Sequence, residues 1–186
     1  MKIQIACAMA FAWMMVSSGA AAARDFEQVA GTAADGTRYY QDSLEIAAPA
    51  AMLWRAFTDQ TAYRAWAAPI SSIDFRIGGA IEASYDPHGK LGDPQNIRNA
   101  IIAYIPERLL VFRNVQAPQG LPGGEVYGQT VKTLEFTSLT PGRTRVTVSG
   151  MGFAGGAAFD KLYGFFAQGD GQMLLGLKRA YEKPAR

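Results

Sequence analysis

Few side chains in this sequence are of the kinds that carry out chemistry, and most of them stand alone. His88 is the only histidine and lies in the turn Asp86-Pro87-His88-Gly89, where an exposed imidazole is expected. The only cysteine, Cys7, lies near the start of the chain. One histidine and one cysteine cannot supply the ligands of a tight transition-metal site, so we expect no metal and no cofactor.

The sequence predicts neither a hydrolytic triad nor a nucleotide-binding site. Serine, histidine and aspartate do not occur at the spacing of a hydrolytic triad, and no Gly-x-Ser-x-Gly sequence occurs. Residues 150–155, GMGFAG, match the spacing of a dinucleotide-binding fingerprint. That fingerprint needs a parallel strand-helix-strand unit, and no strand is predicted after the following helix. We therefore expect these glycines to turn the chain from a sheet onto a helix.

Asp170 is the ionisable residue whose position is most informative, because it falls within a predicted helix. Residues 157–182 carry apolar side chains at helical spacing, and Asp170 follows Phe159 by about three turns, on the apolar face. One interpretation is a carboxylate that lines a cavity, where it holds the polar end of a ligand or accepts a proton. The alternative is that Gly169 and Gly171 loosen the helix and let the carboxylate reach water.

The other elements are predicted from hydrophobic periodicity. Two short helices are expected over residues 52–66, with a break at Thr58-Asp59. Alternation of apolar and polar residues predicts strands around Leu44 and Ile46 and over residues 73–77, 80–85, 97–105, 109–115, 131–139 and 144–149. Tight turns between consecutive strands favour an antiparallel meander. The expected fold class is α+β, with a curved antiparallel sheet of about seven strands closed on one face by the long C-terminal helix.

The N-terminus has the layout of a secretory signal peptide. Lys2 precedes an apolar run over residues 3–16 and small residues over 17–23. The apolar run is short compared with the roughly 20 residues that cross a bilayer, which favours cleavage after Ala23 over a retained membrane anchor. We expect a periplasmic or secreted protein with no membrane insertion after cleavage. Residues 24–37 are predicted to be an N-terminal extension and residues 38–184 a single domain.

The charge balance excludes some partners. The chain has 18 Lys and Arg against 16 Asp and Glu, and only 18% of its residues are charged. Such a composition offers no basic stripe for a phosphate backbone, so nucleic acid is not expected as a partner. The oligomeric state is not indicated by the sequence.

Several segments together resemble one family. The sequence resembles START-like (SRPBCC) domains, and most closely their AHSA-like branch, at LEIAAP (44–49), LWRAFTD (53–59), WAAP (66–69), FRIGG (75–79), IPERLL (105–110) and GRTRVTV (142–148). The resemblance implies a helix-grip (START/Bet v-like) fold whose sheet and last helix enclose a cavity, often for an apolar molecule. Relatives of this branch commonly have Gly-Trp where this chain has Gly169-Asp170. The resemblance implies no particular chemistry, because the superfamily contains carriers, cyclases, hydrolases and co-chaperones.

Strand alternation then predicts which side chains would line such a cavity. The face of residues 95–105 that carries Ile97, Ile101, Ala103 and Ile105 would also carry Asn99. By the same argument the predicted lining includes Tyr85, Phe112, Asn114, Lys132 and Phe136 from the sheet, and Trp66, Tyr163, Phe166 and Asp170 from the helices. Polar groups on an apolar concave face orient a bound small molecule. The alternatives are that the long polar side chains reach water at the rim and that the aromatic residues are ordinary core.

Three functions follow from these expectations. The first is an exported domain that binds a small, largely apolar molecule between the sheet and the helix. The second is an enzyme of the cyclase, dehydratase or hydrolase kind that uses Asp170, Tyr85 or Asn99 in the same cavity. The third is a protein-interaction or co-chaperone-like module, which conflicts with export of the chain.

Overall fold

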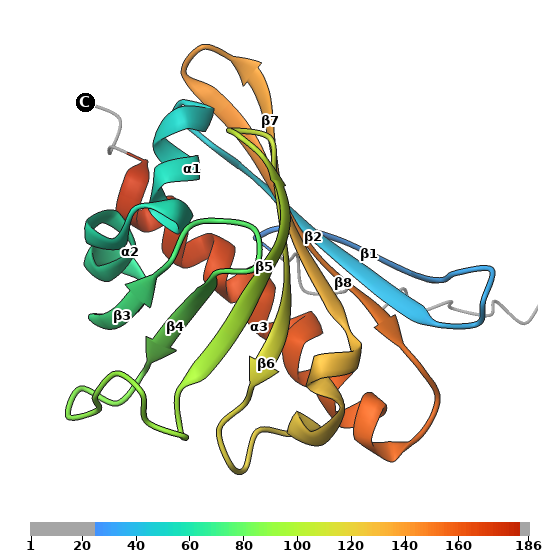
Figure 1. Cartoon of the computed structure of the whole chain (residues 1–186). Coiled ribbons are helices and arrows are strands. Elements are labelled where there is room, and N and C mark those ends of the chain that lie inside the picture. The colour runs from blue at the N-terminus through green and yellow to red at the C-terminus, as the bar shows by residue number, and fades with distance from the viewer. Residues whose placement is uncertain (1–24, 183–186) are drawn as a thin grey trace, which may run out of the picture.

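The computed structural model describes residues 25–182, and these form one antiparallel sheet covered on one face by a long helix (Figure 1). The strands are β1 (Glu27–Thr32), β2 (Arg38–Ile46), β3 (Ile70–Ile73), β4 (Ala80–Ser84), β5 (Ile97–Ile105), β6 (Leu109–Gln116), β7 (Val131–Thr140) and β8 (Arg143–Phe153). The helices are α1 (Ala50–Thr58), α2 (Gln60–Trp66), the 3₁₀ helix η1 (Gly124–Gln129) and α3 (Ala157–Tyr181). The predicted α+β fold class, a curved sheet with a long C-terminal helix, is confirmed.

The order of the strands places the first and last parts of the chain side by side. Across the sheet the order is β1-β2-β8-β7-β6-β5-β4-β3, and every neighbouring pair is antiparallel. The helices α1 and α2 connect β2 to β3 at the opposite edge, and α3 runs across the same face of the sheet (Figure 1). No helix within residues 25–182 combines the length and apolarity of a membrane span.

The break between the two short helices occurs where the sequence predicts it. Asp59 ends α1 and caps α2, because its Oδ1 accepts a hydrogen bond from the Ala62 N–H at 2.8 Å. This cap changes the direction of the chain, so that Trp66 packs back against Phe57 with a ring-centroid distance of 5.2 Å.

Two hydrophobic clusters form the interior. The larger one joins α1 and the C-terminal half of α3 to the middle of the sheet, through residues such as Trp54, Leu134 and Leu174. The smaller one gathers Tyr40 and Phe153 from the sheet, Tyr127 from η1 and Phe166 from α3. The helix α3, with 25 residues and a rise of about 1.5 Å per residue, is long enough to reach both clusters.

The sheet has eight strands rather than about seven. The additional strand is β1, which lies in the segment 24–37 that was expected to be an extension, and it pairs with β2 along its whole length. The predicted strand over residues 73–77 is also wrong, because β3 ends at Ile73. Residues 74–79 form a turn in which Gly78 has a φ of 79° and its N–H binds the Ile101 carbonyl.

An irregularity in β5 overturns part of the predicted face assignment. The pairing of β5 with β6 shifts register between Ile101 and Ala103, and an inserted residue reverses which side chains face the interior. As a result Tyr104 packs against the larger cluster and Ile105 is 48% exposed, whereas Ile105 was expected to point inward. The predicted signal peptide, residues 1–23 with Cys7, lies outside the described residues.

Candidate functional site

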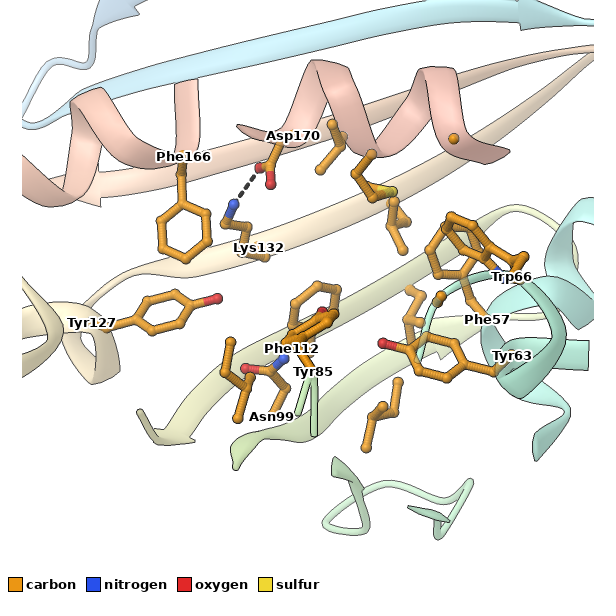
Figure 2. A pocket seen from close by; sticks show the side chains of 18 residues that line it. Phe57, Tyr63, Trp66, Tyr85, Asn99, Phe112, Tyr127, Lys132, Phe166 and Asp170 are labelled. Carbon is orange, nitrogen blue, oxygen red and sulfur yellow. Dashed lines mark hydrogen bonds and ion pairs between the residues drawn. The ribbon is translucent and has the colours of Figure 1, made fainter. Parts of the chain in front are cut away.

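A cavity of about 360 Å³ lies between the sheet and α3, where the two hydrophobic clusters meet (Figure 2). Most of its wall is apolar or aromatic. It is lined by Phe57, Tyr63, Trp66, Ala67, Ile81, Tyr85, Ile97, Asn99, Leu110, Phe112, Tyr127, Lys132, Leu134, Val148, Phe166, Asp170, Met173 and Gly176.

The helices α1 and α2 supply one aromatic end of the cavity. Trp66 contacts both Phe57 and Tyr63 edge to face, with ring centroids 5.2 and 6.3 Å apart. The Trp66 indole N–H donates a hydrogen bond to the Ala56 carbonyl at 2.8 Å, which satisfies its polar atom and leaves the ring as wall.

Several polar groups lie among these apolar surfaces. Figure 2 shows the hydroxyls of Tyr63 and Tyr127 pointing into the cavity from opposite sides. Tyr85 lines the cavity although 67% of its surface is exposed, so it marks the mouth. The Asn99 side-chain amide is held by its neighbour on β6, because Asn114 Nδ2 donates a hydrogen bond to Asn99 Oδ1 at 3.1 Å.

The most unusual feature is a buried ion pair at the opposite end. Lys132 of β7 donates a hydrogen bond to Asp170 Oδ2 of α3 (Figure 2). It donates a second one to the Tyr40 hydroxyl at 2.7 Å. The Tyr40 hydroxyl in turn donates to Asp170 Oδ2 at 2.6 Å. Lys132 is 4% exposed and its Nζ lies 3.7 Å from the centroid of the Phe166 ring. Three elements that are distant in sequence therefore fix one ammonium group at the cavity wall.

The pKa of Lys132 and the pKa of Tyr40 are shifted in opposite directions. Burial lowers the pKa of Lys132 because it removes water from the ammonium, and the Asp170 carboxylate partly opposes that effect. Burial also raises the pKa of Tyr40, and Asp170 raises it further, so the hydroxyl stays a hydrogen-bond donor.

A second buried carboxylate lies beside the group formed by Lys132, Asp170 and Tyr40. Asp42 of β2 has no exposed surface, and its Oδ1 accepts a hydrogen bond from Gln28 Nε2 at 2.7 Å. Burial raises the pKa of Asp42, and the hydrogen bond from Gln28 opposes this effect. Gln28 also donates to the Ala167 carbonyl at 2.6 Å, which ties β1 to α3 next to the site.

A glycine makes room for the cluster. Gly150 of β8 pairs with Tyr40 of β2 on one side and with Lys132 of β7 on the other. A Cβ atom at Gly150 would lie 2.6 Å from the Tyr40 ring, so only glycine lets that ring cross β8 toward Lys132. The first glycine of the fingerprint-like sequence thus serves a structural purpose within β8, and α3 is the last element that the structure describes.

Seven of the ten residues proposed from the sequence line this cavity, namely Trp66, Tyr85, Asn99, Phe112, Lys132, Phe166 and Asp170. Asp170 lies on the buried face of α3 and is paired, rather than turned toward water, and Lys132 is buried rather than at the rim. No group of three or more His, Cys, Asp or Glu within residues 25–182 is placed to hold a metal ion.

The other three proposed residues lie elsewhere, and this is a correction. Asn114 lies beneath Asn99 and is held by the carbonyls of Arg98 and Gln116. Phe136 lies on the same face of β7 as Lys132 but farther along, where it packs against Trp54 and Phe57. Tyr163 packs edge to face against Tyr40 and Phe153 and does not line the cavity.

Sequence reasoning missed Tyr40 and Tyr127. Tyr40 alternates with Asp42 and Leu44 along β2, so extending the period-two pattern toward the N-terminus would have placed it on the buried face. Tyr127 lies in η1, after a segment rich in proline and glycine, and no periodicity marks it as buried.

Comparisons with known proteins show a family and a shared fold. The family model described as activator of Hsp90 ATPase homolog 1-like protein matches residues 47–182. No curated protein matches the sequence.

Similar solved structures share the fold at low identity. An Aha1 dimer from Colwellia psychrerythraea is 15% identical with a TM-score of 0.60, over 76% of this chain and 94% of that one. CalU16 from Micromonospora echinospora is 20% identical with a TM-score of 0.57, over 86% and 87%. A conserved protein of unknown function from Enterococcus faecalis is 14% identical with a TM-score of 0.59, over 86% and 80%.

Proposed function

The chain belongs to the activator of Hsp90 ATPase homolog 1-like family, and from that premise we propose that its cavity binds a small, largely apolar molecule. The observation that carries the proposal is the cavity of about 360 Å³ between the sheet and α3. Ligand sites of this kind are concave and mostly apolar, with a few polar groups that fix orientation.

The volume limits the size of the molecule. An apolar cavity of about 150 Å³ accommodates benzene. The cavity here is more than twice as large, which suits a molecule with one ring or with two fused rings. Tyr85 at the mouth marks the route of entry from solvent.

The two ends of the cavity differ in polarity, and this difference sets the orientation. Phe57 and Trp66 supply an aromatic end without free polar atoms. Lys132 and Asp170 supply a charged end, and the Tyr127 hydroxyl points into the cavity at this same end (Figure 2). A molecule with one apolar end and one oxygen-bearing end would match both.

The proposal is tested by NMR titration with naphthalene. The methyl group of Met173 lines the cavity and is expected to shift on binding, whereas the methyl group of Met52, which is 46% exposed on α1, is expected not to shift. Ala67 lines the cavity and Ala65, two residues before it, is exposed. Ala67→Phe should abolish the Met173 shift, and the matched Ala65→Phe should retain it. A Met173 methyl that does not respond in any of the proteins would refute the proposal.

We also propose that the chain is exported, on the strength of the signal-like residues 1–23. Sequencing the N-terminus of protein recovered from its host is expected to begin at Arg24. An intact Met1 would contradict export. It would also favour a co-chaperone-like function, the activity that the family description names.

A further inference from the structure

Lys132 differs from the other lysines of the described chain in its surroundings. Lys90 and Lys161 are exposed and Lys178 is half-buried, whereas Lys132 is 4% exposed and lines the cavity. A lysine in an apolar site loses hydration of its ammonium form, which favours the neutral amine. The neutral amine is the form that attacks carbonyl carbons.

Stability alone is a weak reason for this arrangement. A buried ion pair gives little net stabilisation, because removing both charges from water costs about as much as their attraction returns. The Lys132–Asp170 pair nevertheless lies at one end of a cavity whose walls are otherwise mostly apolar. Its placement at the cavity wall, rather than deep in a cluster, suggests that the ammonium meets a ligand.

We propose that Lys132 forms an iminium bond with a bound carbonyl compound, so that the ligand class is a small apolar aldehyde or ketone. This inference rests on the proposed function, since the molecule must first enter the cavity. The aromatic end would hold the apolar body of the molecule, and its carbonyl would face Lys132.

The neighbouring groups can move the protons that this step requires. The Lys132 ammonium first gives a proton to Asp170, with which it shares a hydrogen bond. The Nζ lone pair then forms a bond to the carbonyl carbon, the C=O π bond breaks, and the oxygen takes the proton from Asp170. The nitrogen gives a second proton to Asp170, which passes it to the hydroxyl group, and water leaves as the C=N bond forms. An ammonium and a carbonyl thus become an iminium and one water.

The charge of the site is the same before and after this reaction. The iminium carries one positive charge, as the ammonium does, so the attraction of the Asp170 carboxylate persists. The Phe166 ring, whose centroid lies 3.7 Å from Nζ, continues to face a cation. The groups that hold Lys132 in the free protein therefore also stabilise the product.

The test uses benzaldehyde as the probe and cyanoborohydride to reduce any iminium to a stable amine. Peptide mapping by mass spectrometry is expected to find the benzyl group mainly on Lys132, above Lys90, Lys161 and Lys178. Benzyl alcohol has the same size but cannot condense, so an excess of it should protect Lys132 alone. Ala67→Phe should reduce the labelling of Lys132 by about tenfold or more, and Ala65→Phe should leave it unchanged.

The outcomes separate this inference from the proposed function. Binding of benzyl alcohol, seen at the Met173 methyl, together with unlabelled Lys132 would overturn the iminium and leave ligand binding intact. Labelling of Lys132 that benzyl alcohol does not reduce would also overturn the inference, because it would show reaction outside the cavity. Failure of both binding and labelling would overturn both proposals.

Discussion

Asp170, Lys132 and Tyr40 show how three side chains can keep charge inside an apolar interior. The Oδ2 atom of the Asp170 carboxylate accepts hydrogen bonds from both the Lys132 ammonium and the Tyr40 hydroxyl. An unpaired charge at this depth would be far costlier than the pair, because no water replaces the lost partner.

Removing one member of the pair should therefore be more harmful than removing both. Lys132→Met leaves Asp170 buried without its cation, and we expect it to lower the free energy of unfolding by about 3–5 kcal/mol. The double variant Lys132→Met/Asp170→Leu should recover most of that loss, since it leaves no charge unpaired. Chemical denaturation of the three proteins measures both values. A double variant as unstable as the single one would contradict the account.

Asp42 makes the stability of the protein depend on pH, and the sign of this dependence follows from the burial of its carboxyl group. Burial raises its pKa above the value of about 3.9 in the unfolded chain, so the folded protein binds the proton more tightly. The contribution of Asp42 to stability is therefore greatest below the unfolded pKa and falls as the pH rises through the folded pKa. Asp42→Asn cannot ionise and keeps an oxygen for Gln28.

We expect Asp42→Asn to be more stable than the natural protein by about 1 kcal/mol near pH 8, because it escapes the cost of a buried charge. The advantage should shrink as the pH is lowered to about 3, below the pKa of about 3.9 in the unfolded chain, because Asp42 is then mostly protonated in both states. Urea denaturation at several pH values measures it. An advantage that grows on acidification would show that the sign is wrong.

At the scale of elements, Gly150 on β8 decides whether β2 and β7 can bring Tyr40 and Lys132 together. Gly150→Ala should displace the Tyr40 ring and lower the free energy of unfolding by about 1–3 kcal/mol. Gly155 belongs to the same glycine-rich segment, and a Cβ there would meet no atom within 4 Å. Gly155→Ala is thus the matched control, and it should change stability little. Equal effects of the two substitutions would argue against the steric role of Gly150.

The elements also show where sequence reasoning succeeds. Periodicity predicted α1, α3 and most strands, because their apolar residues recur regularly, and the capping residue Asp59 predicted the start of α2. The same periodicity placed Asp170 on the inner face of α3. It failed at Ile105, where a register shift in β5 reverses the alternation, and at β1, whose exposed residues carry no apolar signal.

At the scale of the whole molecule, the cavity is a consequence of two clusters that do not merge. One is centred on α1 and the C-terminal half of α3, the other on η1, and Leu134 and Phe166 come from different clusters yet line the same space. Local patterns cannot predict such a gap, because its volume depends on how distant side chains fail to fill the space between sheet and helix. The resemblance to START-like domains suggested a cavity, but its size and its ion pair came from the structure.

The central claim is that this space is hollow and accessible. It is tested most directly by a crystal structure of the protein under xenon pressure, since xenon occupies apolar cavities. We expect a strong xenon peak between Leu134, Val148 and Phe166, with the surrounding side chains unmoved. A closed interior, in which those side chains touch and no peak appears, would contradict the account.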